Sequence, residues 1–148
     1  MKTQFNRILT IVLAITLAFS FLTPITASAA SSGTVQPYAS NYLTAYNTYI
    51  SRVSGGIQIW YEVMGTGVMD EIGVLSIELY EVDSNGNETW LKTYQHEDYS
   101  SMLIENDFCH SSYVSYQGST NKTYKAYVCI WAGKNGSGDT RYMWATMV

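Results

Sequence analysis

A glycine-rich stretch near the C-terminus contains residue types that could bind phosphate. Residues 133–140 read GKNGSGDT and combine three glycines with a lysine and two hydroxyl side chains, as a phosphate-binding loop would. Such a loop needs the spacing Gly-x-x-x-x-Gly-Lys-Ser/Thr and a following helix, because the helix N-terminus supplies part of the attraction for phosphate. Lys134 follows only one glycine, and residues 141–148 alternate like a strand. The stretch is therefore predicted to be a hairpin turn, in which glycine supplies positive φ angles.

Two polar groups could suggest an active site. Asp70 and Glu71 are adjacent, but catalytic carboxylates converge across a cleft at about 5–10 Å, which sequence neighbours rarely do. Asp70 is expected instead to order a turn or loop. His96 begins the polar run HED at residues 96–98, which is typical of a solvated loop.

The sequence thus predicts no catalytic residue, no metal site and no cofactor. The chain has only two histidines, so a three-ligand zinc site would need carboxylates at unconstrained distances. The alternative is a small secreted hydrolase or toxin-like enzyme. That activity would need four side chains to converge in one pocket: Asp70, Glu71, His96 and His110.

Cys109 and Cys129 are the two cysteines, and an even number in an exported chain suggests a disulfide. A hairpin of residues 110–117 and 122–132 would place the two cysteines opposite each other. If these segments belong to different sheets, Cys129 points away from Cys109 and no bond forms. The sequence leaves both possibilities open.

Residues 1–29 are predicted to be a secretory signal peptide. Lys2 and Arg7 precede a mostly apolar run at residues 8–22, and Ala27-Ser28-Ala29 fits the small-x-small rule of a signal peptidase site. A membrane-spanning helix would need about 20 apolar residues. We therefore expect cleavage next to Ala29 and release outside the cell, with no membrane association afterwards.

The chain that follows is acidic. Residues 1–30 hold two basic residues and no acidic one, so the remainder has six basic against twelve acidic residues, a net charge of about −6. Nucleic-acid binding needs clustered Lys and Arg. This charge balance therefore argues against nucleic acid and anionic membranes as partners.

Residues 30–41 are expected to be a flexible segment before one β-rich domain at 42–148. The chain has 13 Tyr and 4 Trp, residue types that fit a pleated, half-buried surface. Short alternating runs predict seven strands, at residues 43–52, 56–64, 72–82, 88–95, 110–117, 122–132 and 140–148. This number and spacing predict an all-β, antiparallel β-sandwich.

Alternation assigns the two faces of each strand, because side chains change sides at every residue. The expected inner residues are Ile57, Ile59, Tyr61, Val63, Leu75, Ile77, Leu79, Tyr124, Ala126, Val128 and Ile130. The expected outward rings are Trp60, Tyr80, Tyr127 and Trp131. If residues 56–64 lie in the opposite sheet, Trp60 belongs to a different surface from the other three. Outward rings can stack on sugars, although cross-strand packing that only stabilises the sheet is an alternative.

The last hairpin is expected to extend this outward aromatic surface. If Arg141 faces solvent, then Tyr142 and Trp144 point inward and Arg141 lies opposite Trp131. An arginine above a tryptophan ring would form a cation–π contact of about 0.5–1 kcal/mol. Arg141 therefore joins the candidate binding residues.

A second turn is expected in the stretch EVDSNGNETW, residues 81–90. Asn85-Gly86 is a favoured two-residue turn because both residue types tolerate positive φ. Asp83 could also begin a calcium-binding loop, but that loop needs Gly at its sixth and Glu at its twelfth position, where this chain has Glu88 and Tyr94. A turn without calcium is predicted.

Residues 123–141, TYKAYVCIWAGKNGSGDTR, resemble the penultimate strand, loop and last strand of a fibronectin type III-like domain. The resemblance implies an immunoglobulin-like sandwich, with Tyr124 as the corner tyrosine of the turn at 118–123 and Trp60 as the early-strand tryptophan. Over most of the chain, GTGVMDEIGVLSIELYE and WAGKNGSGDTRYMW are similar to a group of short secreted proteins of Gram-positive bacteria. That similarity implies no activity.

The sequence therefore predicts a secreted, extracellular, non-enzymatic module. It would bind a glycan, a cell surface or a protein through four residues: Tyr80, Tyr127, Trp131 and Arg141. Besides the hydrolase, the remaining alternative is a passive structural or envelope protein without a specific ligand.

Overall fold

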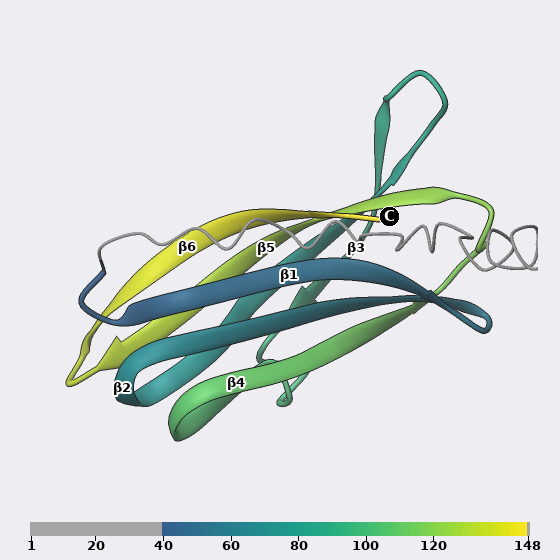
Figure 1. The fold of residues 1–148 in the computed structure, drawn as a ribbon. Helices are drawn as coiled ribbons and strands as arrows, with labels where there is room; N and C mark the ends of the chain where they lie inside the picture. Colours follow the sequence, from purple (N-terminus) through teal and green to yellow (C-terminus); the bar gives the residue numbers. More distant parts are fainter. Residues whose placement is uncertain (1–39, 148) are drawn as a thin grey trace, which may run out of the picture.

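A computed structural model describes residues 40–147, which form one curled antiparallel sheet of six strands (Figure 1). The strands are β1 Leu43–Val53, β2 Gly56–Val82, β3 Glu88–Gln95, β4 Leu103–Gln117, β5 Thr123–Lys134 and β6 Ser137–Thr146. Within residues 40–147 no helix is long and apolar enough to cross a membrane. The expected signal peptide at 1–29 lies outside the described residues, as does most of the segment at 30–41.

The long strand β2 organises the sheet. It reverses its direction near the middle, as Figure 1 shows. Its first half pairs with β1 and β4, and the β4 ladder continues past the bend to Gly73. Its second half pairs with β5 from Glu71 and with β3 from Ser76. The segments expected as separate strands at 56–64 and 72–82 are therefore two halves of one strand, which is why the structure has six strands instead of seven.

Glycine permits the reversal of β2. The register with β4 skips from Met64 to Met69. A Cβ atom on Gly65 would lie 2.9 Å from the carbonyl oxygen of Gly67, closer than a side chain tolerates. Because glycine lacks this atom, the chain can bend tightly here.

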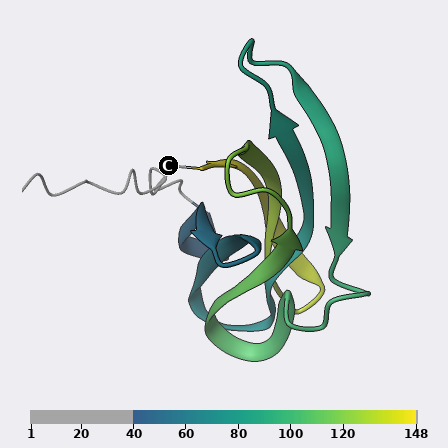
Figure 2. The ribbon, with the colours of Figure 1, turned by 90° about the vertical axis from the view of Figure 1, so that its right-hand side faces the viewer.

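The curl produces two layers that face each other (Figure 2). One layer contains β1, the first half of β2 and β4, and the other contains the second half of β2 with β3, β5 and β6. β1 returns towards the end of β6, where Ile50 and Met147 form an isolated bridge. The all-β, antiparallel class is confirmed, but the strands belong to one curled sheet and not to two separate sheets.

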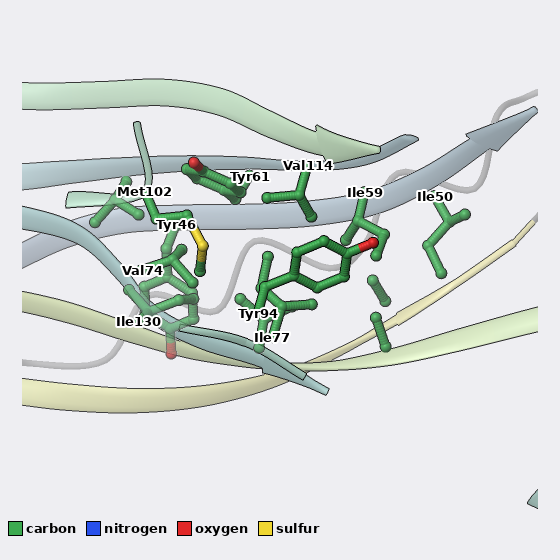
Figure 3. Packing of buried hydrophobic residues seen from close by; sticks show 14 of the residues in the cluster. Tyr46, Ile50, Ile59, Tyr61, Val74, Ile77, Tyr94, Met102, Val114 and Ile130 are labelled. Carbon is green, nitrogen blue, oxygen red and sulfur yellow. The ribbon is translucent and has the colours of Figure 1, made fainter. Parts of the chain in front are cut away.

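The concave side of the sheet holds one apolar core, in which side chains of both layers interdigitate (Figure 3). The inner residues predicted for segments 56–64, 72–82 and 122–132 are buried with one exception. A register irregularity between Val74 and Ser76 places Val74 in the core and leaves Leu75 only half-buried. A bulge inserts an extra residue, which shifts the alternation by one position.

Three buried tyrosines connect the core to surrounding backbone. The hydroxyl of Tyr61 donates to the carbonyl oxygen of Ser101 at 2.9 Å, and that of Tyr94 donates to Ser115 at 2.8 Å. Tyr124 donates to the carbonyl of Ser119 at 3.1 Å, within the turn before β5. Each ring therefore fills apolar space while its polar end remains satisfied.

The disulfide between Cys109 and Cys129 is not formed, and both thiols are free. β4 pairs with β2 and not with β5, so the hairpin that would have joined the two cysteines does not exist. Cys109 stands opposite Met64 in one layer, whereas Cys129 stands opposite Ser76 in the other. The two segments lie in different layers, as the alternative without a disulfide needs, but these layers belong to one sheet and not to the two sheets that it assumed.

The glycine-rich stretch is a hairpin turn, as predicted. Asn135 and Gly136 have φ angles of 54° and 73° and connect Lys134 to Ser137, the last paired residues of β5 and β6. Positive φ at both central residues is typical of the two-residue turn that matches strand twist. A phosphate-binding loop is excluded because β6, and no helix, follows.

The turn between β2 and β3 differs from the expectation. Gly86 has a φ of 84°, but Asn85 is not in the positive region, and five residues separate the last pair of the ladder. The carboxylate of Asp83 accepts the backbone amides of Asn85 and Asn87 at 2.8 Å. Hydrogen bonds from Asn87, above all from its side chain, lower the pKa of Asp83. Asp83 therefore orders a turn, without a two-residue geometry.

Candidate functional site

The register of the last hairpin decides which rings face outward. The turn at Asn135-Gly136 pairs Tyr127 with Trp144 and Cys129 with Tyr142. Directly paired residues of antiparallel strands project from the same side of the sheet. Tyr142 and Trp144 therefore lie on the outward side, where they are 60% and 43% exposed. The expectation that they point inward is wrong by one residue of register.

Arg141 lies on the opposite side from Trp131. It pairs with the buried Ile130, whereas Trp131 pairs with Thr140. The guanidinium of Arg141 donates to the carbonyl of Thr140 at 2.9 Å and lies 3.7 Å from the carboxylate of Asp139. Arg141 is therefore not part of the outward aromatic surface, and the expected pair with Trp131 is absent.

Six rings project outward from the layer that contains β3, β5 and β6. We call this set the large aromatic face: Tyr80, Trp90, Tyr127, Trp131, Tyr142 and Trp144. Four of these rings form a continuous cluster. Tyr127 stacks on Tyr142 at 5.4 Å between ring centroids and contacts Trp144 at 4.6 Å. Tyr80 contacts the same Trp144 at 5.9 Å between ring centroids. Trp144, which was expected to point inward, therefore connects the rings of Tyr80 and Tyr127.

Charged groups fix the orientation of this cluster. The Lys125 ammonium lies 3.9 Å from the centroid of the Trp144 ring and 2.7 Å from the carboxylate of Glu88. The Tyr80 hydroxyl donates to Glu78, and this hydrogen bond raises the pKa of Tyr80. The rings are therefore held in place before any ligand arrives, which reduces the entropic cost of binding.

Two members of the large aromatic face lie apart from the cluster. Trp90, on the protruding hairpin of β2 and β3, is 59% exposed and donates its indole N–H to Thr93 at 3.2 Å. Trp131 lies towards the β5–β6 turn, above two glycines. A Cβ on Gly138 would be 2.4 Å from the Trp131 ring, so glycine is needed for the indole to lie close to the sheet.

Trp131 also borders a cavity of about 460 Å³ near the β5–β6 turn. Its indole N–H donates to the carboxylate of Glu71 at 3.2 Å. Glu105 stands directly opposite Glu71 on β4 and lines the same cavity. Among residues 40–147 no three His, Cys, Asp or Glu side chains come together as a metal site would require.

Asp70 performs the ordering role that was expected for it. Its carboxylate accepts the backbone amide of Asn135 at 2.6 Å, while Lys134 donates to the carbonyl of Val68 at 2.9 Å. These two contacts connect the middle of β2 to the β5–β6 turn. Asp70 thereby stabilises the hairpin whose register places the outward rings.

The four residues considered for a hydrolase do not share this cavity. Asp70 and Glu71 line it, but His96 and His110 do not. The His110 ring is hydrogen bonded to the carbonyl of Ser101 at 2.7 Å, and His96 lies 3.3 Å from the carboxylate of Glu97. Each histidine has its own local partner, so this cavity lacks a histidine to work with its carboxylates.

The free thiol of Cys129 is also a poor nucleophile. It lies on the outward side of β5 but is covered, and burial raises its pKa. Only the thiolate reacts readily, so a raised pKa makes a cysteine inert near neutral pH.

A second, smaller group of rings lies on the outward side of the other layer. Tyr49, Trp60 and Tyr113 stand directly opposite one another on β1, β2 and β4, and we call them the small aromatic face. Trp60 is the central ring and contacts both neighbours, at 6.1 Å and 4.6 Å between centroids. Trp60 thus lies on a different surface from Tyr80, Tyr127 and Trp131, although the two layers belong to one sheet.

The fold and these surfaces define a class of protein: a curled all-β domain with rigid aromatic faces on its outer side. A comparison of the chain with protein-family models, with curated proteins and with solved structures found no match. The resemblances to fibronectin type III-like domains and to secreted Gram-positive proteins therefore remain predictions.

Sequence reasoning missed Trp90, Tyr142 and Trp144. For the latter two a signal was present: Asn135-Gly136 is the strongest short hairpin signal, and centring the turn on it gives the correct register. Trp90 had no such signal, because a register irregularity in β2 and β3 next to Tyr80 decides its side.

Proposed function

We propose that the protein is a secreted, non-enzymatic domain that binds a glycan through the large aromatic face. The observation that carries the proposal is the cluster of Tyr80, Tyr127, Tyr142 and Trp144, which stays partly exposed although the rings contact one another. A pyranose ring presents a face of C–H groups that stacks on aromatic rings, and its hydroxyls bond to polar groups at the ring edges.

The surroundings of the cluster supply those polar groups. Glu78, Glu88 and Thr93 lie on the same side of the sheet as the rings, as do Thr140 and Thr146 at the β6 edge. These groups can hydrogen bond to sugar hydroxyls. Large exposed apolar patches on a soluble domain generally mark a binding surface.

We also propose that the domain is a variant of the fibronectin type III-like or immunoglobulin-like sandwich. The hydrogen bond from the Tyr124 hydroxyl to the carbonyl of Ser119, five residues earlier, supports this. A tyrosine that bonds back to the preceding turn is a hallmark of immunoglobulin-like sandwiches. An experimental structure in which the two layers are distinct sheets, without the continuous β2 that joins them here, would support this assignment, and one in which Tyr124 lacks this hydrogen bond would contradict it.

Retention on insoluble polysaccharides tests the proposed function. The protein without residues 1–29 is incubated with cellulose, chitin and bacterial cell walls, and the bound fraction is measured. The double variant Tyr142→Ala/Trp144→Ala should be retained at least tenfold more weakly on the glycan that the wild type binds. Phe108→Ala is the matched control, because it removes an exposed ring outside both aromatic faces.

The comparison of retention between wild type and variants is valid only if the variants are folded. Circular dichroism and a urea titration before the binding assay establish this. We expect the double variant to fold, because neither substituted ring is part of the buried core. Equal retention of wild type and double variant would overturn the assigned surface. Failure of every polysaccharide to retain the wild type would remove glycan binding as the function.

A further inference from the structure

The small aromatic face has a regular geometry. Tyr49, Trp60 and Tyr113 occupy directly paired positions on three neighbouring strands, so their rings form a row perpendicular to the strands. The rings of Tyr49 and Trp60 are nearly parallel, with an angle of 6° between their planes. The indole N–H of Trp60 donates to the Ser51 hydroxyl at 3.2 Å, which fixes the orientation of the central ring.

Much of this row remains open to solvent. Tyr49 and Tyr113 are 41% and 43% exposed. No described residue hydrogen bonds to either phenol hydroxyl, so both hydroxyls can bond to a ligand. Packing of the sheet alone would not require two outer rings to present their edges and hydroxyls to solvent.

The surroundings of the row define the chemistry of its ligand. The outward positions next to the rings carry amide and hydroxyl groups and a single carboxylate: Asn47, Ser51, Gln58, Glu62, Ser111 and Ser115. A nearly uncharged surface offers no attraction to a polyelectrolyte. It complements a neutral ligand rich in hydroxyl groups.

The small and large aromatic faces lie on opposite sides of the core. The inner residues of the two layers pack against each other in one cluster, so the outward sides of the layers point away from each other. A glycan chain on one face cannot reach across the core to the other. Two chains could bind at the same time.

We propose that the small aromatic face is a second site for a neutral glycan chain, and that the protein therefore links two chains. This inference rests on the proposed function of the large aromatic face. Two weak sites on one domain raise the retention on an insoluble polymer, in which neighbouring chains are held together, well above that of each site alone, because the second chain is already close when the first is bound.

Calorimetric titration with cellohexaose and with the N-acetylglucosamine hexamer tests the inference. The wild type should bind two molecules of at least one probe. Trp60→Ala should bind one molecule, and Tyr142→Ala/Trp144→Ala should also bind one. Tyr49→Ala/Tyr113→Ala serves as a second variant of the small face in case the loss of Trp60 unfolds β2.

The outcomes separate the two proposals. One site in the wild type that is lost with Tyr142 and Trp144, and is unchanged in Trp60→Ala, overturns the inference and leaves the proposed function intact. One site that is lost only with Trp60 overturns the role of the large face. No binding of either probe overturns both.

Light scattering of the protein alone tests the other possible occupant, a second copy of the chain. The inference predicts a monomer for the wild type and for Trp60→Ala. A wild-type dimer that becomes a monomer in Trp60→Ala would show that the small face is a self-association surface, and would overturn the second glycan site.

Discussion

The two aromatic faces contain ring pairs of the same geometry in different chemical surroundings. Trp60 and Tyr113 on the small face, and Trp144 and Tyr127 on the large face, both have centroids 4.6 Å apart and planes tilted by 41°. Around the small face the groups are amides, hydroxyls and the single carboxylate of Glu62, whereas Lys125, Glu78 and Glu88 flank the large face. The rings supply shape in both places, and the neighbouring strands supply the charge that distinguishes ligands.

The faces also differ in what positions them. The small face consists of three residues in direct register on β1, β2 and β4. The large face depends on the turn at Asn135-Gly136 and on the contact of Asp70 with that turn. The position of the small face therefore depends only on the pairing of its own three strands. The position of the large face also depends on residues outside it, such as Asp70.

The largest effect is expected at Gly73, where β2 is paired with both β4 and β5. Gly73 has a φ of 148°, and a Cβ there would lie 2.2 Å from the carbonyl oxygen of Met102. Gly73→Ala should lower the free energy of unfolding by about 3 kcal/mol or more, because backbone strain and overlap with a carbonyl combine. Urea unfolding measures the loss.

The matched control for this change is Gly67→Ala, since an added Cβ at Gly67 meets no atom within 4 Å. It should change the free energy of unfolding by less than about 1 kcal/mol. If Gly73→Ala weakens binding at one aromatic face only and leaves stability intact, the two faces do not both depend on the backbone of β2 at Gly73.

The next largest effect is a loss of stability at alkaline pH that comes mainly from the layer of the large face. Burial raises the pKa of Tyr94 from 10.0 to about 12. Because the folded state holds its proton more tightly than the unfolded chain, stability is complete below pH 10 and falls as pH rises towards 12. One pKa unit corresponds to about 1.4 kcal/mol, so Tyr94 accounts for about 2–3 kcal/mol of this loss.

Urea midpoints measured between pH 8 and pH 12 check this expectation. Tyr94→Phe should unfold more easily than wild type at pH 8, because its hydrogen bond to Ser115 is lost, yet should lose less stability from pH 10 to pH 12. Burial also raises the pKa of Tyr61, in the small-face layer, so Tyr61→Phe is the comparison variant. Identical pH profiles for wild type and Tyr94→Phe would contradict the assignment.

A moderate effect is expected from ring coupling within each face. Double-mutant cycles on Tyr127 with Trp144, and on Tyr113 with Trp60, should both give coupling energies of about 0.5–1.5 kcal/mol, because the two pairs share one geometry. Urea unfolding of the single and double alanine variants provides the values. A coupling present in one face and absent in the other would show that the rings of the second face are not held together in solution.

The smallest effect on the free energy of unfolding is expected at Lys125, whose ammonium group lies at the large face. Lys125→Met should cost about 0.5–1 kcal/mol, since it removes the cation above Trp144 and the pair with Glu88. Lys122→Met is the control: Lys122 pairs with Glu81 at a more exposed site and lies over no ring. An equal cost for both variants would show that the cation–π contact contributes nothing measurable.

The sequence predicted which side chains of β2 and β5 are buried, because alternation follows directly from the pleat of a strand. It could not predict Leu75, since a bulge shifts the alternation at Val74 and leaves no mark in the residue types. It misplaced Arg141 for a related reason: the side of a β6 residue depends on register, and register depends on where the turn begins.

The candidate site was predicted in part. Tyr80, Tyr127 and Trp131 face outward as expected, but the rings that join them, Tyr142 and Trp144, were assigned to the core. The disulfide could not be decided either, because it depends on whether β4 pairs with β2 or with β5, and no residue type marks that choice. Such pairings between distant segments are properties of the assembled sheet.

By itself the sequence determined the period of two in its apolar residues, and with it the strand class, most of the core and the outward direction of several rings. Only the tertiary structure decided how those rings gather into two faces, because it fixed the bend in β2, the strand neighbours and the register of β6. A residue's side depends on its own strand, but its neighbours depend on how distant strands align.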